Sequence, residues 1–273
     1  SQAFNLSFSD RHEFYGDPDF VDVPINGLLS KGYTKTQRNR ISMETAFSEM
    51  PDPGNPWLFE DRSGREKLGH PDIKRDRLEQ DTSYTCVVDK WGNSFSATPS
   101  DAVFGSPIVP GLGLMISSRG TQSWLDPEHP SSVGPWKRPR LTPNPAMAFK
   151  KGKLFMPFGT PGGDAQCPAM VQTFLNIVEF GMNPQAAIEA PRFVPWNFPN
   201  SFWPHAYHPG LIHLEGRISR EVGQNLSSRG HHVEYVDDWS ASMGAMSCIV
   251  VDQDTGALSA GADPRRDAYA IGR

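Results

Sequence analysis

The segment from Asp81 to Asp101 reads DTSYTCVVDKWGNSFSATPSD, and it decides what kind of fold this sequence encodes. A run of strand-forming residues, TSYTCVVD, is followed by KWGN and then by a second such run, SFSAT. Gly92 and Asn93 readily take the positive φ of a tight turn, so the segment predicts a β-hairpin. Hydroxyl-bearing side chains fill positions 82–85, which is typical of an exposed strand face or, if one of them is activated, of a nucleophile.

The composition indicates a globular chain with room for a substantial core. It has 273 residues, of which 37% are hydrophobic and 21% charged, and its formal net charge is −5. No apolar run approaches the roughly 20 residues of a membrane-spanning helix. Basic residues do not gather with aromatic ones, so we expect neither a nucleic-acid nor a membrane partner.

The cysteines and histidines do not form a metal-binding pattern. Cys86, Cys167 and Cys248 lie far apart beside apolar stretches, so we expect buried free thiols, which weakly favours the cytoplasm. The segment PHAYHPGLIH (204–213) has no acid or cysteine to complete a metal site, and His231 and His232 point to opposite faces of a predicted strand. We therefore expect no metal and no cofactor.

Hydrophobic periodicity outlines the remaining elements. Residues 1–43 predict two helical pieces around a loop at 15–33, and residues 44–80 lack a sustained period and indicate a linker or mobile segment. After the hairpin we expect a buried strand at 152–159, three helices that end before Gly181, Pro191 and Gly230, a strand at 231–237 and a closing hairpin at 246–264. This order predicts a layered α/β (α+β) sandwich with antiparallel sheets.

The sequence starts inside a helical pattern, with Phe4 and Phe8 four residues apart and no initiating Met or signal peptide. We therefore expect it to be the C-terminal part of a longer protein. A targeting signal could lie in the earlier part, so a periplasmic or secreted location stays open.

Thr82 is a candidate nucleophile because it lies at the junction of the linker and the first strand. A threonine hydroxyl needs a base beside it, and one solution is to make the threonine an N-terminus whose own α-amine serves as that base. This requires cleavage between Asp81 and Thr82, at the point where the linker meets the first strand. Ser100 follows the return strand, so its hydroxyl can lie beside Thr82. The structural alternatives are that Thr82 is an ordinary strand residue and that Ser100 is a turn residue whose hydroxyl is hydrogen-bonded locally.

The segment FGTPGGD (158–164) leaves a buried strand and enters a helix. The backbone N–H groups of Gly162 and Gly163 can point outward together there, near a helix N-terminus, which is the geometry of an oxyanion hole. The alternative is an ordinary tight strand-to-helix turn.

Collinear motifs then resemble one known family, the gamma-glutamyltransferases, which are N-terminal nucleophile hydrolases. The motifs are YGDPDF, VVDKWGNSFS, FGSPIVPGLG, KRPR, FGTPGGD, IEAPRF and GADPRRD, and the resemblance covers essentially the whole chain. It implies a four-layer αββα sandwich and a precursor that cuts itself. Residues 1–81 would be the tail of a large subunit with its processing linker, and 82–273 the small catalytic subunit. The rest of the large subunit would be the partner, and a dimer of such heterodimers is the assembly to test.

The resemblance also implies residue roles. Thr82 matches the autoprocessing nucleophile, Ser100 a second hydroxyl residue that bonds it, and Gly162 and Gly163 the oxyanion-hole glycines. The positions that bind substrate in the family depart from its usual residues, and we expect them at Asp101, Arg119, Gln122 and Thr142. Where the family usually places two serines, this chain has Leu141 and Thr142, and where it places an acid for the substrate ammonium, this chain has the neutral Gln122.

These departures predict an amide hydrolase or acyltransferase whose acyl group lacks the α-ammonium of glutamate. Arg119 could bind a carboxylate of that group, or it could instead form a structural salt bridge. Two other functions stay open: a true gamma-glutamyl transferase acting on glutathione-like substrates, and an unprocessed, non-catalytic homologue. We expect Asp263 to Arg266 to form a structural ion-pair corner, and the aromatic segment 193–207 to pack near the pocket or line it.

Overall fold

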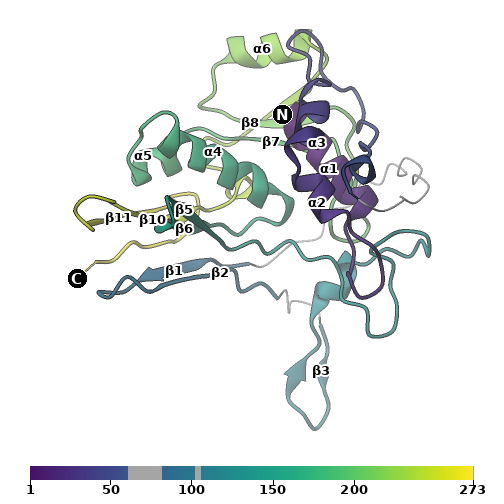
Figure 1. Cartoon of the computed structure of the whole chain (residues 1–273), viewed down its shortest axis with the longest axis horizontal. Coiled ribbons are helices and arrows are strands. Elements are labelled where there is room, and N and C mark those ends of the chain that lie inside the picture. Colours follow the sequence, from purple (N-terminus) through teal and green to yellow (C-terminus); the bar gives the residue numbers. More distant parts are fainter. Residues whose placement is uncertain (61–81, 102–105, 273) are drawn as a thin grey trace.

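The computed structural model describes residues 1–60, 82–101 and 106–272 of the chain (Figure 1). Its N-terminal part packs as a group of short helices: α1 (Gln2–Phe14), α2 (Ile25–Leu29), α3 (Lys31–Arg38) and the 3-10 helix η1 (Pro56–Phe59). The expected loop at 15–33 is wrong in part, because it contains α2 and the start of α3. Ser30 starts α3 by accepting a hydrogen bond from the N–H of Tyr33.

The predicted linker is also wrong over residues 44–60, which pack against the rest of the chain. Met50 is 4% exposed and Trp57 is 7% exposed. The N–H of Ala46 donates to the carbonyl of Arg229. Buried apolar side chains hold this stretch in place without regular periodicity, which is why its sequence resembles a linker. The remainder of the predicted linker, 61–80, lies outside the described residues.

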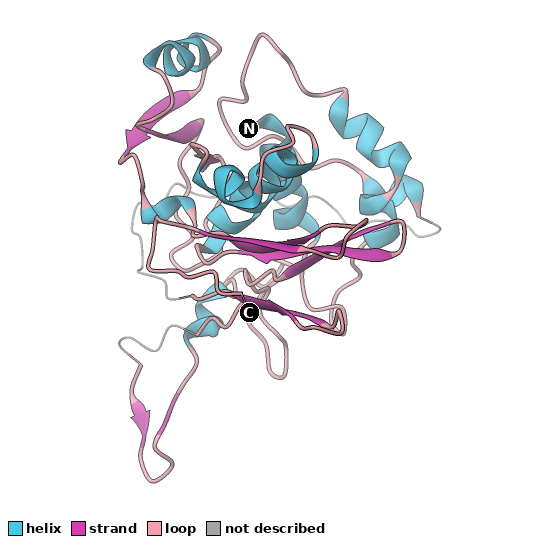
Figure 2. Ribbon diagram, turned by 90° about the vertical axis from the view of Figure 1, so that its left-hand side faces the viewer, coloured by secondary structure: helices cyan, strands magenta, loops and turns pink. Residues whose placement is uncertain are grey.

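Two sheets stack face to face in the centre of the molecule (Figure 2). The larger has the antiparallel order β11-β10-β6-β5 and is built from β5 (Ala146–Lys150), β6 (Lys153–Gly159), β10 (Ser247–Val251) and β11 (Leu258–Ala262). Against one face lies the hairpin of β1 (Thr85–Val88) and β2 (Ser94–Ala97), and against the other lie α4 (Gln166–Val178) and α5 (Pro184–Glu189). Both predicted hairpins are therefore confirmed, and the described residues form a helix layer and two sheet layers of an α+β sandwich.

Side chains of the β1–β2 hairpin point alternately toward the larger sheet and away from it. Cys86 and its partner Ser96 are partly buried, whereas Val87 and Phe95 lie opposite each other and are 53% and 59% exposed. A hydrophobic core lies between the larger sheet and the helices α4 and α5. It contains Met156, Met170, Ile188, Met246 and Cys248. The expectation of buried thiols holds for Cys248 but is wrong for Cys167, which is exposed; all three cysteines are free.

A third sheet lies beside α1. It has the order β7-β8-β9, from β7 (Phe193–Pro195), β8 (Leu211–Glu215) and β9 (His232–Val236), and α6 (Arg220–Ser228) connects its parallel pair β8 and β9. The short strands β3 (Ile108–Val109) and β4 (Leu114–Met115) form an arm that extends from the body in Figure 1. Sequence patterns predicted none of β3, β4, β5, β7 and β8. None of the helices in the described part of the chain combines the length and the apolar character that crossing a membrane requires.

Candidate active site

Thr82 and Ser100 lie side by side at the open end of the β1–β2 hairpin. Thr82 is 6% exposed, and its Oγ1 is 2.6 Å from Ser100 Oγ. The N–H of Ser83 donates to the carbonyl of Pro99 at 2.9 Å, which extends the pairing of the two strands to this point. The structure thus brings together two of the residues expected at the site. Asp81, the expected residue before the cleaved bond, lies outside the described residues.

Beyond Ser100, hydrogen bonds lead to the 3-10 helix η2 (Ser118–Gln122). Ser117 Oγ donates to Asp101 Oδ1 at 2.7 Å and accepts from the N–H of Arg119 at 3.2 Å. Ser117 is therefore the N-cap of η2, and Asp101 holds that cap in place. The exposed Asp101 thus has a structural partner in addition to its expected role at the substrate.

Gln122 and Thr142, two expected substrate-binding residues, are bonded to each other. Gln122 is fully buried, and its Nε2 donates to Thr142 Oγ1 at 3.2 Å. Gln122 Oε1 has no hydrogen-bond partner among the described residues. A buried polar atom without a partner is costly, and such an atom beside a reaction site can accept a hydrogen bond from a ligand.

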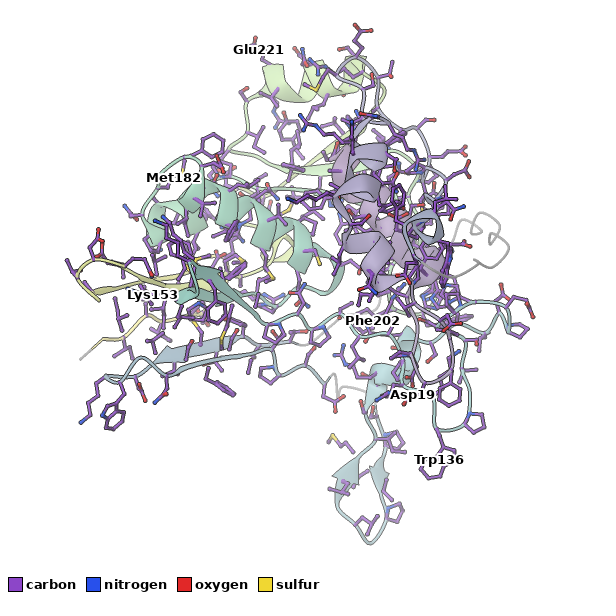
Figure 3. The ribbon with its side chains drawn as sticks, viewed as in Figure 1. Asp19, Trp136, Lys153, Met182, Phe202 and Glu221 are labelled. Carbon is purple, nitrogen blue, oxygen red and sulfur yellow. The ribbon has the colours of Figure 1, made fainter. Side chains whose placement is uncertain are left out.

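Arg119 is the second residue of η2 and is 7% exposed. Its guanidinium carbon lies 5.1 Å from the ring centroid of Phe202, which is labelled in Figure 3. This distance is typical of a cation–π contact, which orients the guanidinium plane. Arg119 and Gln122 therefore both lie on η2 and are both buried, while their expected roles at the substrate stay predictions.

The glycine pair forms the turn between β6 and α4. Gly162 has φ 129° and Gly163 has φ 54°, a region of backbone space that favours glycine at both positions. A Cβ on Gly162 would also lie 3.2 Å from the Cα of Gly244. Thr160 Oγ1 accepts from the N–H of Ala245 at 2.6 Å and anchors the start of the turn. We call residues 160–163 the glycine turn.

The glycine turn and Thr82 lie at the same end of the stacked sheets. The ring of Tyr84, two residues after Thr82, covers Gly159 so closely that a Cβ there would lie 2.3 Å from it. Tyr84 OH is also 2.8 Å from Ser96 Oγ, which holds the ring within the hairpin. The start of β1 therefore lies over the end of β6, where the glycine turn begins.

Asp164 directly follows the glycine turn, and its side chain is fully buried. It accepts hydrogen bonds from the N–H of Ser201 at 2.6 Å and from Ser201 Oγ at 2.7 Å, and Arg11 Nη1 lies 2.5 Å from its Oδ1. Burial alone would raise the pKa of Asp164, but the Arg11 charge and the Ser201 hydrogen bonds outweigh it and hold that pKa below its ordinary value. The sequence patterns singled out neither Arg11 nor Ser201, because each lies far along the chain from the motif that contains Asp164.

Residues 201–203 connect the glycine turn to η2. Ser201 binds Asp164, the ring of Phe202 lies against Arg119, and the N–H of Trp203 donates to the carbonyl of Thr121 at 2.7 Å. Sequence reasoning expected the aromatic segment 193–207 to pack near the pocket or to line it. These contacts bring three of its residues against Asp164 and η2, and the pocket itself stays a prediction.

The family of this chain follows from its sequence as a whole. The family model described as gamma-glutamyltranspeptidase matches residues 1–273. The chain belongs to the gamma-glutamyltranspeptidase family. The glutathione hydrolase proenzyme of Bacillus subtilis is 30% identical over 100% of this chain, and the oxamate amidohydrolase proenzyme of Klebsiella pneumoniae is 33% identical over 99% of it. The chain spans 44% and 46% of these two relatives, which is less than half of their length.

A solved structure supports the same assignment. The crystal structure of cephalosporin acylase from Bacillus halodurans superimposes on this chain with a TM-score of 0.78 and 29% identity, covering 100% of this chain and 44% of that one. This similarity to a solved acylase confirms the predicted fold class, the α+β sandwich of the gamma-glutamyltranspeptidase family.

Next to the glycine turn, this gamma-glutamyltranspeptidase family member has a buried ion-pair network. Arg192 Nη1 donates to the carbonyls of Met243 and Gly244, and Gly244 packs against Gly162. Arg192 Nη2 lies 2.6 Å from Asp263 Oδ2, and Arg265 binds Glu215 through both of its oxygens. The structural ion-pair corner predicted for Asp263 to Arg266 is therefore confirmed for Asp263 and Arg265, whereas Arg266 donates to the carbonyl of Ala241. Among the described residues, no group of three histidine, cysteine or acidic side chains is arranged to hold a metal ion.

Proposed function

We propose that this chain is the part of a self-processing amide hydrolase or acyltransferase that carries its nucleophile, Thr82. The observation that carries the proposal is the buried Thr82 hydroxyl, 2.6 Å from Ser100 Oγ and next to the predicted cleavage bond. Family membership supports it, since relatives over the whole chain are named as proenzymes.

In the first stage, the precursor cuts itself. Thr82 Oγ attacks the carbonyl carbon of Asp81, the peptide C–N bond breaks, and an ester forms while the nitrogen becomes the free α-amine of Thr82. Water then hydrolyses the ester, which releases the carboxyl group of Asp81 and regenerates the Thr82 hydroxyl. Ser100 Oγ is close enough to orient that hydroxyl in both steps.

In the second stage, the new α-amine takes the proton from Thr82 Oγ as it attacks the substrate amide. The N–H groups of Gly162 and Gly163 stabilise the oxyanion, a contribution of ~3 kcal/mol for a typical donor. The amine of the substrate leaves with a proton, and an acyl-enzyme ester remains on Thr82. Water completes hydrolysis, or a second amine completes transfer.

The substrate we propose has an acyl group that lacks an α-ammonium and carries a carboxylate. By the family resemblance, the neutral Gln122 stands where an acid would bind the ammonium, and Arg119 lies three residues earlier on η2. Relatives named oxamate amidohydrolase and cephalosporin acylase support an acyl group other than glutamyl. The glutathione hydrolase relative keeps a true gamma-glutamyl enzyme as the alternative.

Mass spectrometry of the purified full-length protein tests the nucleophile. We expect a fragment that starts at Thr82, and Thr82→Ala should abolish both the cut and amide cleavage. Ser100→Ala should slow maturation and reduce kcat on the order of tenfold, since a positioned hydrogen bond to the nucleophile is lost. An uncut wild-type protein would favour the non-catalytic homologue, and a Thr82→Ala protein that still matured would refute the assignment.

Paired substrates test the acyl group. We expect a higher kcat/KM on glutaryl-p-nitroanilide than on γ-glutamyl-p-nitroanilide, which differ only in the α-ammonium. Arg119→Met should lower kcat/KM on both compounds, because the carboxylate that they share loses its bidentate partner. A clear preference for the glutamyl compound would favour the gamma-glutamyl alternative while leaving the Thr82 mechanism intact.

A further inference from the structure

A buried carboxylate next to an oxyanion site raises an electrostatic problem. The side chain of Asp164 is fully buried, and it directly follows Gly163 in the chain. Amide cleavage at the glycine turn builds up negative charge, and an uncompensated carboxylate in a low-dielectric environment would oppose that charge. The site therefore needs a cation that neutralises Asp164.

Arg11 supplies that cation from α1, on the N-terminal side of the predicted cleavage bond. Its Nη1 lies 2.5 Å from Asp164 Oδ1, and its side chain is only 16% exposed. The guanidinium carbon lies 4.1 Å from the ring centroid of Phe8 and 5.5 Å from that of Phe198. These two rings stack on each other at 3.8 Å, so the aromatic surface that holds the guanidinium is itself packed in the core.

Ser201 also binds Asp164, from a segment other than α1. Its N–H and hydroxyl both donate to the carboxylate, which leaves Asp164 bound by two separate segments. The two residues directly before Asp164, Gly162 and Gly163, belong to the glycine turn and both have positive φ. Anchoring the side chain of Asp164 therefore restricts the glycine turn.

We infer that Arg11 is a positioning residue for amide cleavage: it holds and neutralises Asp164, and thereby fixes the glycine turn and shields the oxyanion from a second negative charge. The inference rests on the proposed function, because it assigns the oxyanion to Gly162 and Gly163. It also means that the fragment before the cut contributes to the reaction after maturation.

Other ionisable groups around the pair are Arg140, Tyr15 and Cys167. Arg140 Nη2 donates to Ser201 Oγ at 3.3 Å and its Nη1 to the carbonyl of Arg11 at 3.4 Å, so it reaches the carboxylate through intermediates. Burial, reinforced by the nearby Arg11 charge, lowers the pKa of Arg140 to about 9. Arg11 is therefore the direct counter-ion of Asp164.

Steady-state kinetics on the full-length, matured protein test the inference, with kcat expressed per Thr82 N-terminus determined by mass spectrometry. Arg11→Met should reduce kcat on the order of tenfold or more while KM changes little, because the lost effect acts on the transition state. Arg11→Lys should retain most of kcat. The double variant Arg11→Met/Asp164→Asn should recover much of the loss, because it removes the carboxylate charge as well.

Arg138→Met is the matched control. Arg138 Nη2 lies 2.6 Å from Asp17 Oδ1, so this ion pair also joins the N-terminal segment to the later part of the chain, but away from the glycine turn. We expect its kcat to match the wild type. If the double variant is no faster than Arg11→Met, or if the control loses kcat equally, Arg11 has only a structural role.

The pH profile gives an independent readout. Without Arg11, only the Ser201 hydrogen bonds oppose the effect of burial, so the pKa of Asp164 rises and lowering the pH protonates the carboxyl group more readily than in the wild type. The ratio of kcat for Arg11→Met to that of the wild type should therefore increase as the pH falls, and a flat ratio would overturn the inference. A wild-type protein that never acquires a Thr82 N-terminus would instead refute the proposed function.

Discussion

The hydrogen bond from Gln122 to Thr142 joins two buried side chains that the sequence placed at the substrate. It satisfies one end of the Gln122 amide, while Oε1 has no partner among the described residues. The arrangement keeps one amide atom available to a ligand at the expense of stability, which is common where a protein recognises a polar group.

Thr142→Val should therefore leave both ends of the Gln122 amide without a partner. We expect the free energy of unfolding to fall by about 1–3 kcal/mol and the KM for the substrate to rise, since the amide loses its orientation. Chemical denaturation and steady-state kinetics measure the two effects.

Thr173→Val is the control for this substitution. Thr173 is 1% exposed, and its hydroxyl has no hydrogen-bond partner within the described part of the chain. Removing a buried, unpartnered hydroxyl should leave stability unchanged or increase it, with no effect on KM. Equal losses in the two variants would show that the Gln122 hydrogen bond contributes nothing specific.

Among helices and loops, a stack of rings joins segments that are distant in sequence. Trp124 stacks on His129 at 4.3 Å and on His205 at 3.8 Å, and His12 of α1 meets the indole edge-on at 4.9 Å. The N–H of Ser131 donates to His129 Nδ1 at 2.9 Å, so this nitrogen carries no proton. The stack therefore contains a neutral imidazole.

This ring stack predicts an acid-sensitive fold. Burial, followed by the charges of His12, Arg140, His205 and Lys137, lowers the pKa of His129 below its ordinary value. An unfolded His titrates near about 6.5, so below that pH the unfolded state binds a proton that the folded state does not. Stability is thus fully present above about pH 6.5 and falls as the pH drops, by up to about 1.4 kcal/mol per pH unit.

Denaturation between about pH 7.5 and about pH 5.5 measures this dependence. His129→Asn keeps an acceptor for the N–H of Ser131 but cannot gain a proton, so the variant should be less stable overall and show a shallower decline. A slope equal to that of the wild type would assign the acid sensitivity to other groups.

Elements with short-range signals could be predicted from the sequence, and elements without them could not. The two hairpins have alternating side chains and glycine-containing turns, both of which are local properties. β7 and β8 have neither, because a long proline-rich loop separates them and β8 pairs in parallel with β9 across α6. The loop predicted around α2 was wrong because that helix is five residues long and is stabilised by contacts with η1.

At the scale of the whole molecule, the segment before the predicted cut is embedded in the part after it. Asn197 Nδ2 donates to the carbonyls of Phe47 and Glu49, and Tyr207 OH accepts from the N–H of Met50 at 2.6 Å. The stacked pair of Phe8 and Phe198 adds a buried aromatic contact. These contacts do not depend on the peptide bond between Asp81 and Thr82.

We therefore expect the two fragments to remain associated after maturation. They should elute together in size-exclusion chromatography under native conditions and separate only on a denaturing gel, because the buried contacts outlast the covalent link. The uncut Thr82→Ala protein provides the reference elution volume. Release of the earlier fragment on maturation would contradict both this prediction and a role for Arg11 in turnover.

Local signals in the sequence were enough to predict the two hairpins, the family, and the candidate set of Thr82, Ser100, Gly162 and Gly163, because turns, alternation and collinear motifs are encoded locally. The side-by-side placement of Thr82 and Ser100 at 2.6 Å agrees with it, while their catalytic roles stay predictions. By contrast, the pairing of Arg11 with Asp164, 153 residues later and directly after the glycine turn, is visible only in the folded chain. No local pattern marks such a pair, since a counter-ion is chosen by proximity in the folded chain.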